Sequence, residues 1–312
     1  MQQPKLIRES DMNFNEEMFS VPASAFPVPA ILDTDTYNEI DDQFALIYAL
    51  LSPKRIELRG VTAAPFLNSR STSAGDGMEK SYQEIVRIIG LMGFEGRVPA
   101  FRGAASFLPD RATPVRSAAV DFIVAEAKRA RSRGEKLFVI SIGAITNLAS
   151  ALLTAPEIAD DIVSVWLGGN DHVFENNREF NLSEDIPAAR TVIESAAAHV
   201  RVPCSSVASA LTTTAGDLKR ELADCGKPGE YLFSIFCDFV KGKEKVIWDI
   251  SAVSYLSRPE ATEWEVIPRE KLEDDGSWSF PETDRRMLIA RKIDRNAVFS
   301  DLFTRLRIHV RN

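Results

Sequence analysis

Four aspartates lie close together near the start of the chain, in the segment PAILDTDTYNEIDDQFALIYALLS at residues 29–52. Asp33 and Asp35 end an apolar run typical of a buried strand, and Asp41 and Asp42 precede an apolar run typical of a helix. Carboxylates within a few ångströms of one another repel and resist ionising together. Because oxygen ligands without thiolate or imidazole suit a hard ion, the segment predicts a site for Ca²⁺ or Mg²⁺.

Each aspartate also has a purely structural explanation. Asp41 could cap the helix that follows it, which is a favoured use of aspartate. Asp33 could accept hydrogen bonds from nearby backbone amides. Four such uses within ten positions are much less expected than one, so the metal site is the preferred interpretation.

Polar residues also follow two later apolar runs. One run ends in IGAITN, residues 142–147, where a glycine lets the backbone approach a ligand closely. Another ends in GGND, residues 168–171, and leads to REFN at residues 178–181. Side chains two residues apart in an extended chain point the same way. Glu179 and Asn181 could therefore bind two neighbouring hydroxyl groups, with a polar surface loop as the equal alternative.

Trp248 and Asp249 interrupt an apolar stretch at residues 246–253. An unpaired buried aspartate is costly, and a metal ion would remove that cost. A tryptophan alone is more often part of a core. None of the three histidines lies in a serine-triad or zinc-protease motif, so those hydrolase classes are not indicated.

Apolar and amphipathic segments alternate along the chain. This alternation predicts an α/β fold with a doubly wound, mostly parallel central sheet flanked by helices, and ligands at the carboxyl ends of its strands. The expected strands are residues 27–35, 55–64, 98–104, 136–143, 162–169, 200–207, 262–272 and 278–293, and the expected helices are residues 41–51, 78–91, 117–133, 144–153, 187–198, 217–243, 247–256 and 298–306.

The composition limits the classes of partner. With 312 residues and 45% hydrophobic content, the chain is predicted to form one catalytic domain at residues 27–312, preceded by a polar N-terminal arm at residues 1–26. A net charge of −8 argues against nucleic acid and anionic membranes as partners, and favours a small molecule. No CxxC motif, signal-peptide run or membrane-length segment is present, so we expect a cytoplasmic protein.

Taken in order, the motifs resemble those of the calcium-dependent nucleoside hydrolases of the inosine-uridine-preferring type. The matching segments run from about residue 30 to residue 306 and read DTD with the later DD, GVTAAPFLN, VPAFRGA, ISIGAITNLASAL, VWLGGN, REFNLSEDIPAA and WDISAV. The resemblance implies an N-ribosyl hydrolase that releases base and ribose from a nucleoside, as in purine salvage. It also implies Ca²⁺ rather than Mg²⁺ as the cofactor, and a homodimer or homotetramer.

The same resemblance implies roles for individual residues. Asp35 would be the general base toward a metal-bound water. The metal ligands would be Asp35, Asp42, Asp249 and the backbone carbonyl of Ile142, and the ribose-binding residues would be Asp41, Asn68, Asn170, Glu179 and Asn181.

Two departures from the family pattern are informative. Asp41 lies six positions after Asp35, so the turn at residues 36–40 is longer than in most members, and Asn38 or Glu39 is expected to enter the site. Trp248 stands where many members have a histidine that protonates the leaving base, which resembles the purine-specific branch. An indole stacked on a protonated purine stabilises it by roughly 0.5–2 kcal/mol, so we predict a purine preference.

Two other functions compete with nucleoside hydrolysis. The run ILDTDT also fits a haloacid-dehalogenase-type phosphatase with Mg²⁺, in which Asp33 is the nucleophile and Asp35 the acid. That interpretation leaves Asp42, Asp249 and the REFN segment unexplained. The other alternative is a catalytically idle protein that binds a nucleoside or sugar on the same scaffold, because the first turn is altered and the histidine is absent.

Overall fold

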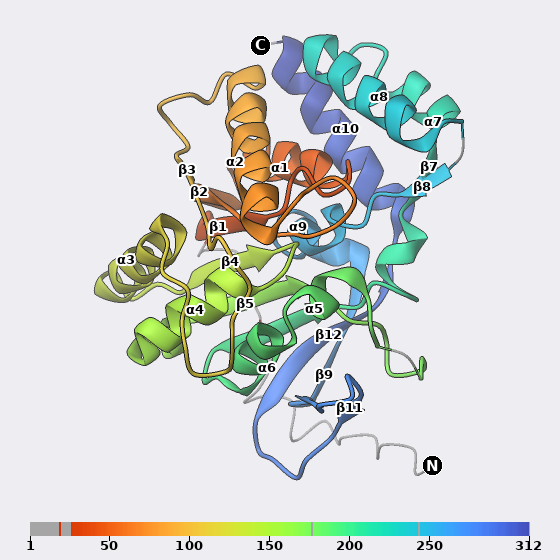
Figure 1. Ribbon diagram of the computed structural model, residues 1–312. Coiled ribbons are helices and arrows are strands. Elements are labelled where there is room, and N and C mark those ends of the chain that lie inside the picture. Colours follow the sequence, from red (N-terminus) through yellow and green to blue (C-terminus); the bar gives the residue numbers. More distant parts are fainter. Residues whose placement is uncertain (1–18, 20–25, 176, 243, 312) are drawn as a thin grey trace.

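An eight-stranded sheet forms the centre of the protein (Figure 1). The computed structural model describes residues 19, 26–175, 177–242 and 244–311. The strands lie in the order β3-β2-β1-β4-β5-β6-β12-β9, and every neighbouring pair is parallel except β12 with β9. Their bounds are β1 (Val28–Thr34), β2 (Ile56–Ala63), β3 (Ala100–Phe101), β4 (Leu137–Ser141), β5 (Ile162–Leu167), β6 (Ala198–Val202), β9 (Thr262–Pro268) and β12 (Arg286–Ile293). The predicted doubly wound, mostly parallel sheet is confirmed.

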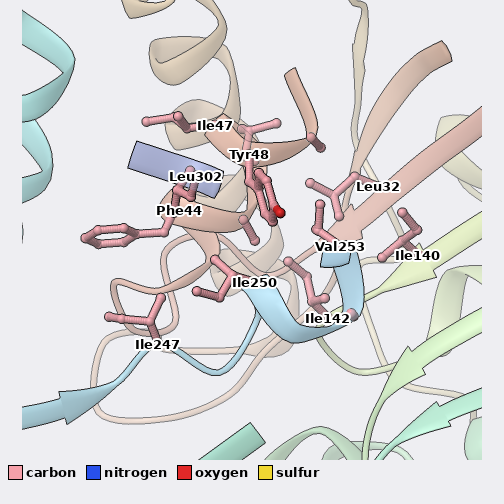
Figure 2. Packing of buried hydrophobic residues seen from close by; sticks show 14 of the residues in the cluster. Leu32, Phe44, Ile47, Tyr48, Ile140, Ile142, Ile247, Ile250, Val253 and Leu302 are labelled. Atoms are coloured by element: carbon pink, nitrogen blue, oxygen red, sulfur yellow. The ribbon is translucent and has the colours of Figure 1, made fainter. Parts of the chain in front are cut away.

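Helices cover both faces of this sheet. Their bounds are α1 (Asp42–Leu50), α2 (Ala74–Leu91), α3 (Ala118–Ser132), α4 (Thr146–Thr154), α5 (Phe180–Glu184), α6 (Ile186–Glu194), α7 (Ala215–Glu221), α8 (Gly226–Val240), α9 (Ile250–Ser257) and α10 (Arg295–Arg311). Successive strand residues point to opposite faces. Leu32 of β1 therefore joins the core under α1, α9 and α10, where Figure 2 shows it near Val253, whereas Ile31 joins the core under α3, α4 and α6.

The strand order reverses between β1 and β4. From β1 the chain first moves outward to β2 and β3, then returns to β4 on the other side of β1 and moves outward again through β5 and β6. In open parallel sheets, ligands bind beyond the carboxyl ends of the strands at such a reversal. Here those ends are Thr34 and Ser141, next to the aspartates that the sequence singles out.

Several predicted boundaries are wrong, each for a local reason. Helix α2 begins at Ala74, not at residue 78, because the Ser73 hydroxyl caps it by accepting a hydrogen bond from the Asp76 amide. Strand β6 ends at Val202, before Pro203, which has no amide hydrogen to donate.

The C-terminal part of the sheet also differs from the prediction. The strand expected at residues 278–293 is divided into β11 (Trp278–Ser279), which pairs with β10 (Lys271–Leu272), and β12, which alone joins the central sheet. Another two-stranded sheet, β7 (Thr212–Thr214) with β8 (Glu244–Val246), was not predicted, because three residues are too few to show a strand pattern.

Most of the N-terminal arm predicted at residues 1–26 lies outside the described residues. Phe19 is buried, and its carbonyl accepts a hydrogen bond of 2.7 Å from the Tyr255 hydroxyl of α9. No helix in the described part of the chain has the length and apolar character needed to cross a membrane. One catalytic domain from residue 27 onward stays a prediction.

Candidate metal and substrate site

The loop between β1 and α1 carries most of the acidic residues. Asp42 is the first residue of α1, and one of its oxygens accepts a hydrogen bond of 2.5 Å from the Thr34 hydroxyl at the end of β1. Burial, and after it the charge of Asp41, raises the pKa of Asp42 to about 7. Asp41 precedes the helix, but its side chain makes no capping hydrogen bond, so capping does not explain this aspartate.

Asp35 is almost completely buried, and its Oδ2 has no hydrogen-bond partner among the described residues. Burial, followed by the charge of Asp42, raises the pKa of Asp35 well above its usual value. A Cβ atom at Gly143 would lie 2.9 Å from the Asp35 carboxylate. The glycine after β4 is therefore needed to make room for the Asp35 side chain. The sequence had suggested that it makes room for a ligand.

Asp249 reaches the same place from the far end of the chain. It precedes α9 and is buried without a capping hydrogen bond. Asp41, Asp42 and Asp249 each offer one carboxylate oxygen within 4.8 Å of the other two. Burial and then the charges of Asp41, Asp42 and Asp35 raise the pKa of Asp249 well above its usual value. The structure thus groups Asp249 with Asp41 and Asp42, whereas the ligand set implied by the family resemblance has Asp35 in place of Asp41.

The carbonyl of Ile142, predicted as a metal ligand, lies just beyond β4. It accepts a hydrogen bond of 3.1 Å from the Asn181 side-chain amide, which also donates to the carbonyl of Leu167 at 3.0 Å. Asn181 therefore joins the ends of β4 and β5. It lies in helix α5, so the argument from an extended chain, in which Glu179 and Asn181 point the same way, is wrong.

The Glu179 carboxylate caps helix α5. It accepts hydrogen bonds from the amides of Gly169, Asn181 and Leu182 and from the thiol of Cys204. Burial still raises its pKa above the usual value despite these hydrogen bonds. These hydrogen bonds from protein groups hold the Glu179 carboxylate against the loop after β5.

The lengthened turn contacts the loop after β2. The Asn68 side-chain amide donates to Asn38 Oδ1 at 2.5 Å, and the Asn38 amide donates to the carbonyl of Asp35 at 2.7 Å. Asn170 lies after β5, where its Oδ1 accepts a hydrogen bond of 3.2 Å from the Ser205 amide. Asn38 and Asn68 therefore lie together where the turn meets the loop after β2, whereas Asn170 is held by the loop that contains Ser205.

Asp33 is fully buried in β1, close in sequence to Asp41 and Asp42 of the acidic cluster. Its Oδ1 accepts hydrogen bonds from the Thr62 hydroxyl at 2.6 Å and the Asn147 side-chain amide at 2.8 Å, and burial raises its pKa to about 6. These donors are side chains and not the backbone amides of the structural alternative. These contacts of Oδ1 join β1, β2 and α4, whereas Oδ2 has no hydrogen-bond partner among the described residues.

Trp248 borders a cavity of about 520 Å³ beside the acidic cluster. Glu39, Phe239 and Lys245 also line it. The backbone amide of Trp248 donates to Asp41 Oδ2 at 3.0 Å, which ties the cavity to the cluster. Sequence reasoning missed Lys245, because nothing in KGKEKVIWD distinguishes it from the two neighbouring lysines.

The donor set fits a hard divalent cation. It consists of buried carboxylates, one of them with an oxygen that lacks a hydrogen-bond partner among the described residues, together with a backbone carbonyl. Carboxylate and carbonyl oxygens are the ligands that Ca²⁺ and Mg²⁺ prefer. Burial, and after it the charge of neighbouring carboxylates, raises the pKa of Asp35, Asp42 and Asp249, and a cation would offset both causes.

Comparisons with known proteins point to one family. The family model described as inosine-uridine preferring nucleoside hydrolase matches residues 30–300. The non-specific ribonucleoside hydrolase RihC of Salmonella enteritidis is 27% identical over 259 residues, which cover 74% of this chain and 78% of that protein.

Two solved structures show the same fold. A purine-preferring ribonucleoside hydrolase from Gardnerella vaginalis has a TM-score of 0.71 at 22% identity, covering 90% of this chain and 99% of that one. The plant nucleoside hydrolase PpNRh1 has a TM-score of 0.69 at 18% identity, with coverage of 90% and 99%. At these identities the structural likeness is evidence for the fold alone.

Proposed function

Since this chain belongs to the inosine-uridine preferring nucleoside hydrolase family and is an N-ribosyl hydrolase, we propose that it hydrolyses purine ribonucleosides in preference to pyrimidine ones, with a divalent cation at its acidic cluster. The observation that carries this proposal is the convergence of Asp41, Asp42 and Asp249 at the carboxyl end of β1. Family membership speaks against the phosphatase alternative.

We expect Asp35, Asp42, Asp249 and the Ile142 carbonyl to hold the cation. Ca²⁺ is favoured over Mg²⁺ because it accepts six to eight oxygen ligands in flexible geometry, whereas Mg²⁺ demands a near-ideal octahedron. A bound divalent cation supplies Lewis acidity, which lowers the pKa of water.

Asp35 is the proposed general base, which accepts a proton from the attacking water. Its Oδ2 lacks a hydrogen-bond partner among the described residues, so this oxygen is available for a proton.

The sugar would lie between the acidic cluster and the loops after β2 and β5. Asp41 is the principal candidate for a ribose hydroxyl, because its carboxylate does not cap α1. Ordering the hydroxyls fixes the sugar for attack and removes entropy from the barrier. The other proposed ribose-binding residues are Asn38, Asn68, Asn170, Glu179 and Asn181.

The base would occupy the cavity next to Trp248, whose volume suits a small ligand. An indole face favours a cationic ring stacked on it. The imidazole ring of a purine has a basic nitrogen with no counterpart in a pyrimidine, so stacking on Trp248 supports departure of a protonated purine. The cytoplasmic location is an expectation from the sequence, and the dimeric or tetrameric assembly is an expectation from the family.

The test is a panel of purine and pyrimidine ribonucleosides assayed for free base, with and without a chelator. We expect faster release from inosine and guanosine than from uridine, loss of activity in the chelator and recovery on addition of Ca²⁺. Full activity in the chelator would refute the metal site. Binding of nucleosides without release of base over hours would favour the idle binding protein.

A further inference from the structure

Lys245 lies at the edge of the acidic cluster, in strand β8 just before Trp248. Its ammonium nitrogen is 3.2 Å from Asp41 Oδ1 and 2.5 Å from Glu39 Oε2, and only 8% of its side chain is exposed. A lysine enclosed to this extent is rare unless its charge is paired. Here the charge is paired with two carboxylates, one of them a proposed ribose-binding residue.

Both oxygens of the Asp41 carboxylate are held by the same segment. Oδ1 contacts the Lys245 ammonium, and Oδ2 accepts a hydrogen bond of 3.0 Å from the Trp248 amide. Asp41 makes no capping bond to its own helix, so β8 and the turn before α9 determine the orientation of this carboxylate. A hydrogen bond to a charged group is stronger than one between neutral groups, and two such bonds to one carboxylate fix its orientation.

We propose that Lys245 is a positioning residue that, with Glu39 of the lengthened turn, holds the Asp41 carboxylate toward the substrate and keeps it out of the ligand set of the cation. The proposal rests on the proposed function. It explains how Asp41 can lie within 4.8 Å of Asp42 and Asp249 and still be reserved for a ribose hydroxyl.

The charges around the site support this role. Asp35, Asp41, Asp42 and Asp249 together outweigh a divalent cation by two charges, and Lys245 compensates one of them. Burial alone would lower the pKa of Lys245, but Asp41 and Glu39 raise it overall, so the ammonium stays charged. The remaining negative charge favours a ribosyl group that becomes positive during cleavage.

The longer turn has a function in this arrangement. The Arg70 guanidinium donates to the Glu39 carbonyl at 3.0 Å, and the Asn68 side-chain amide donates to Asn38 Oδ1. The loop after β2 therefore anchors the turn. The anchored turn presents the Glu39 carboxylate to Lys245. The extra residues between Asp35 and Asp41 therefore supply the second carboxylate that holds the lysine.

A double-mutant cycle tests the proposal, with Lys245→Met, Asp41→Asn and the double variant assayed on inosine. We expect Lys245→Met to lower kcat/KM by about tenfold or more, since a charged hydrogen bond is lost. If Lys245 acts through Asp41, the double variant is no slower than Asp41→Asn alone. Independent, multiplying losses would overturn the proposal.

Calorimetry with Ca²⁺ on the chelator-treated protein gives a readout besides activity. Lys245→Met removes a positive charge and frees Asp41, so we expect Ca²⁺ to bind the variant as tightly as wild type or more tightly. A general disruption of the site would instead weaken Ca²⁺ binding in parallel with activity, and that result would refute the positioning role.

Further variants keep the test valid if Lys245→Met fails to fold. Lys245→Arg retains the charge and should recover most of the activity. Glu39→Gln should lower kcat/KM severalfold and should add no loss to Asp41→Asn. The matched control is Lys128→Met, because Lys128 pairs with Glu157 at 3.1 Å on an exposed surface and its loss should leave kcat/KM unchanged.

The two levels of inference fail in different ways. A wild-type protein that releases no base from any nucleoside would overturn the proposed function. An active wild-type protein with an additive cycle would overturn only the role of Lys245.

Discussion

Replacing Asp249 by asparagine should change the stability of the protein in opposite directions with and without Ca²⁺. Asp249 has 4% exposure, and its carboxylate approaches those of Asp41 and Asp42 within 4.8 Å. At an effective dielectric constant of about 20, two unit charges at that distance repel by about 3 kcal/mol. Because removing one of the three carboxylates relieves part of this repulsion, we expect the variant to gain on the order of 1–3 kcal/mol in a chelator.

Calcium should reverse this order. At a Ca²⁺ concentration about a hundredfold above the dissociation constant, binding stabilises the wild-type protein by about 2.7 kcal/mol. Asp249→Asn loses a proposed ligand and should gain little. Thermal unfolding followed by circular dichroism at pH 8, in chelator and in Ca²⁺, measures both effects, which correspond to shifts of a few degrees in Tm.

The control for this experiment is Asp121→Asn, because Asp121 is exposed on α3, far along the chain from the cluster. It should unfold like wild type in both buffers. The reasoning is refuted if Asp249→Asn is less stable than wild type in the chelator and Ca²⁺ stabilises both proteins equally.

Three further changes test other parts of the structure. Trp248→Ala should lower inosine turnover by roughly twofold to thirtyfold and uridine turnover less, and unchanged inosine turnover would exclude the stacking role. Gly143→Ala places a methyl group 2.9 Å from the Asp35 carboxylate and should reduce kcat by about a hundredfold with little change in Tm, so normal kinetics would contradict the proposed base. His199 is buried, and burial followed by the charge of Arg269 lowers its pKa to about 3. Since its unfolded pKa is about 6.5, wild type should lose about 2 kcal/mol of stability between pH 7 and pH 5, and His199→Gln should lose correspondingly less in denaturant titrations.

The fold could be predicted from the sequence because its central strands are buried on both faces. Strands such as β1, β4 and β5 read as continuous apolar runs, and their order relative to the helices left few topologies open. Segments outside that core were predicted less well. Strands β7 and β8 have three residues each, which is too few for a periodic pattern. The segment between β11 and β12 lies outside the central sheet, so it has no strand periodicity either.

The candidate site was predictable in its acidic residues and not in its partners. Aspartates at strand ends are conspicuous because a buried carboxylate needs compensation, and this physical cost drew attention to Asp33, Asp35, Asp41, Asp42 and Asp249. The division of roles among them came from the family resemblance. The compensating groups carry no such signal. Lysine is common on surfaces, so only the folded chain shows that Lys245 is enclosed between Glu39 and Asp41.

The same difference between acidic residues and their partners explains why the argument from an extended chain was wrong for Glu179. Its carboxylate accepts hydrogen bonds from the amides of Asn181 and Leu182 in the first turn of α5, which lack partners within the helix, and from the Gly169 amide in the loop after β5. A sequence therefore shows which groups need a partner, whereas the partner is often a backbone group that the fold itself exposes. In this chain the groups that the sequence did not reveal are amides and one cation that satisfy conspicuous acids, and our proposal is that this cation, Lys245, also affects function.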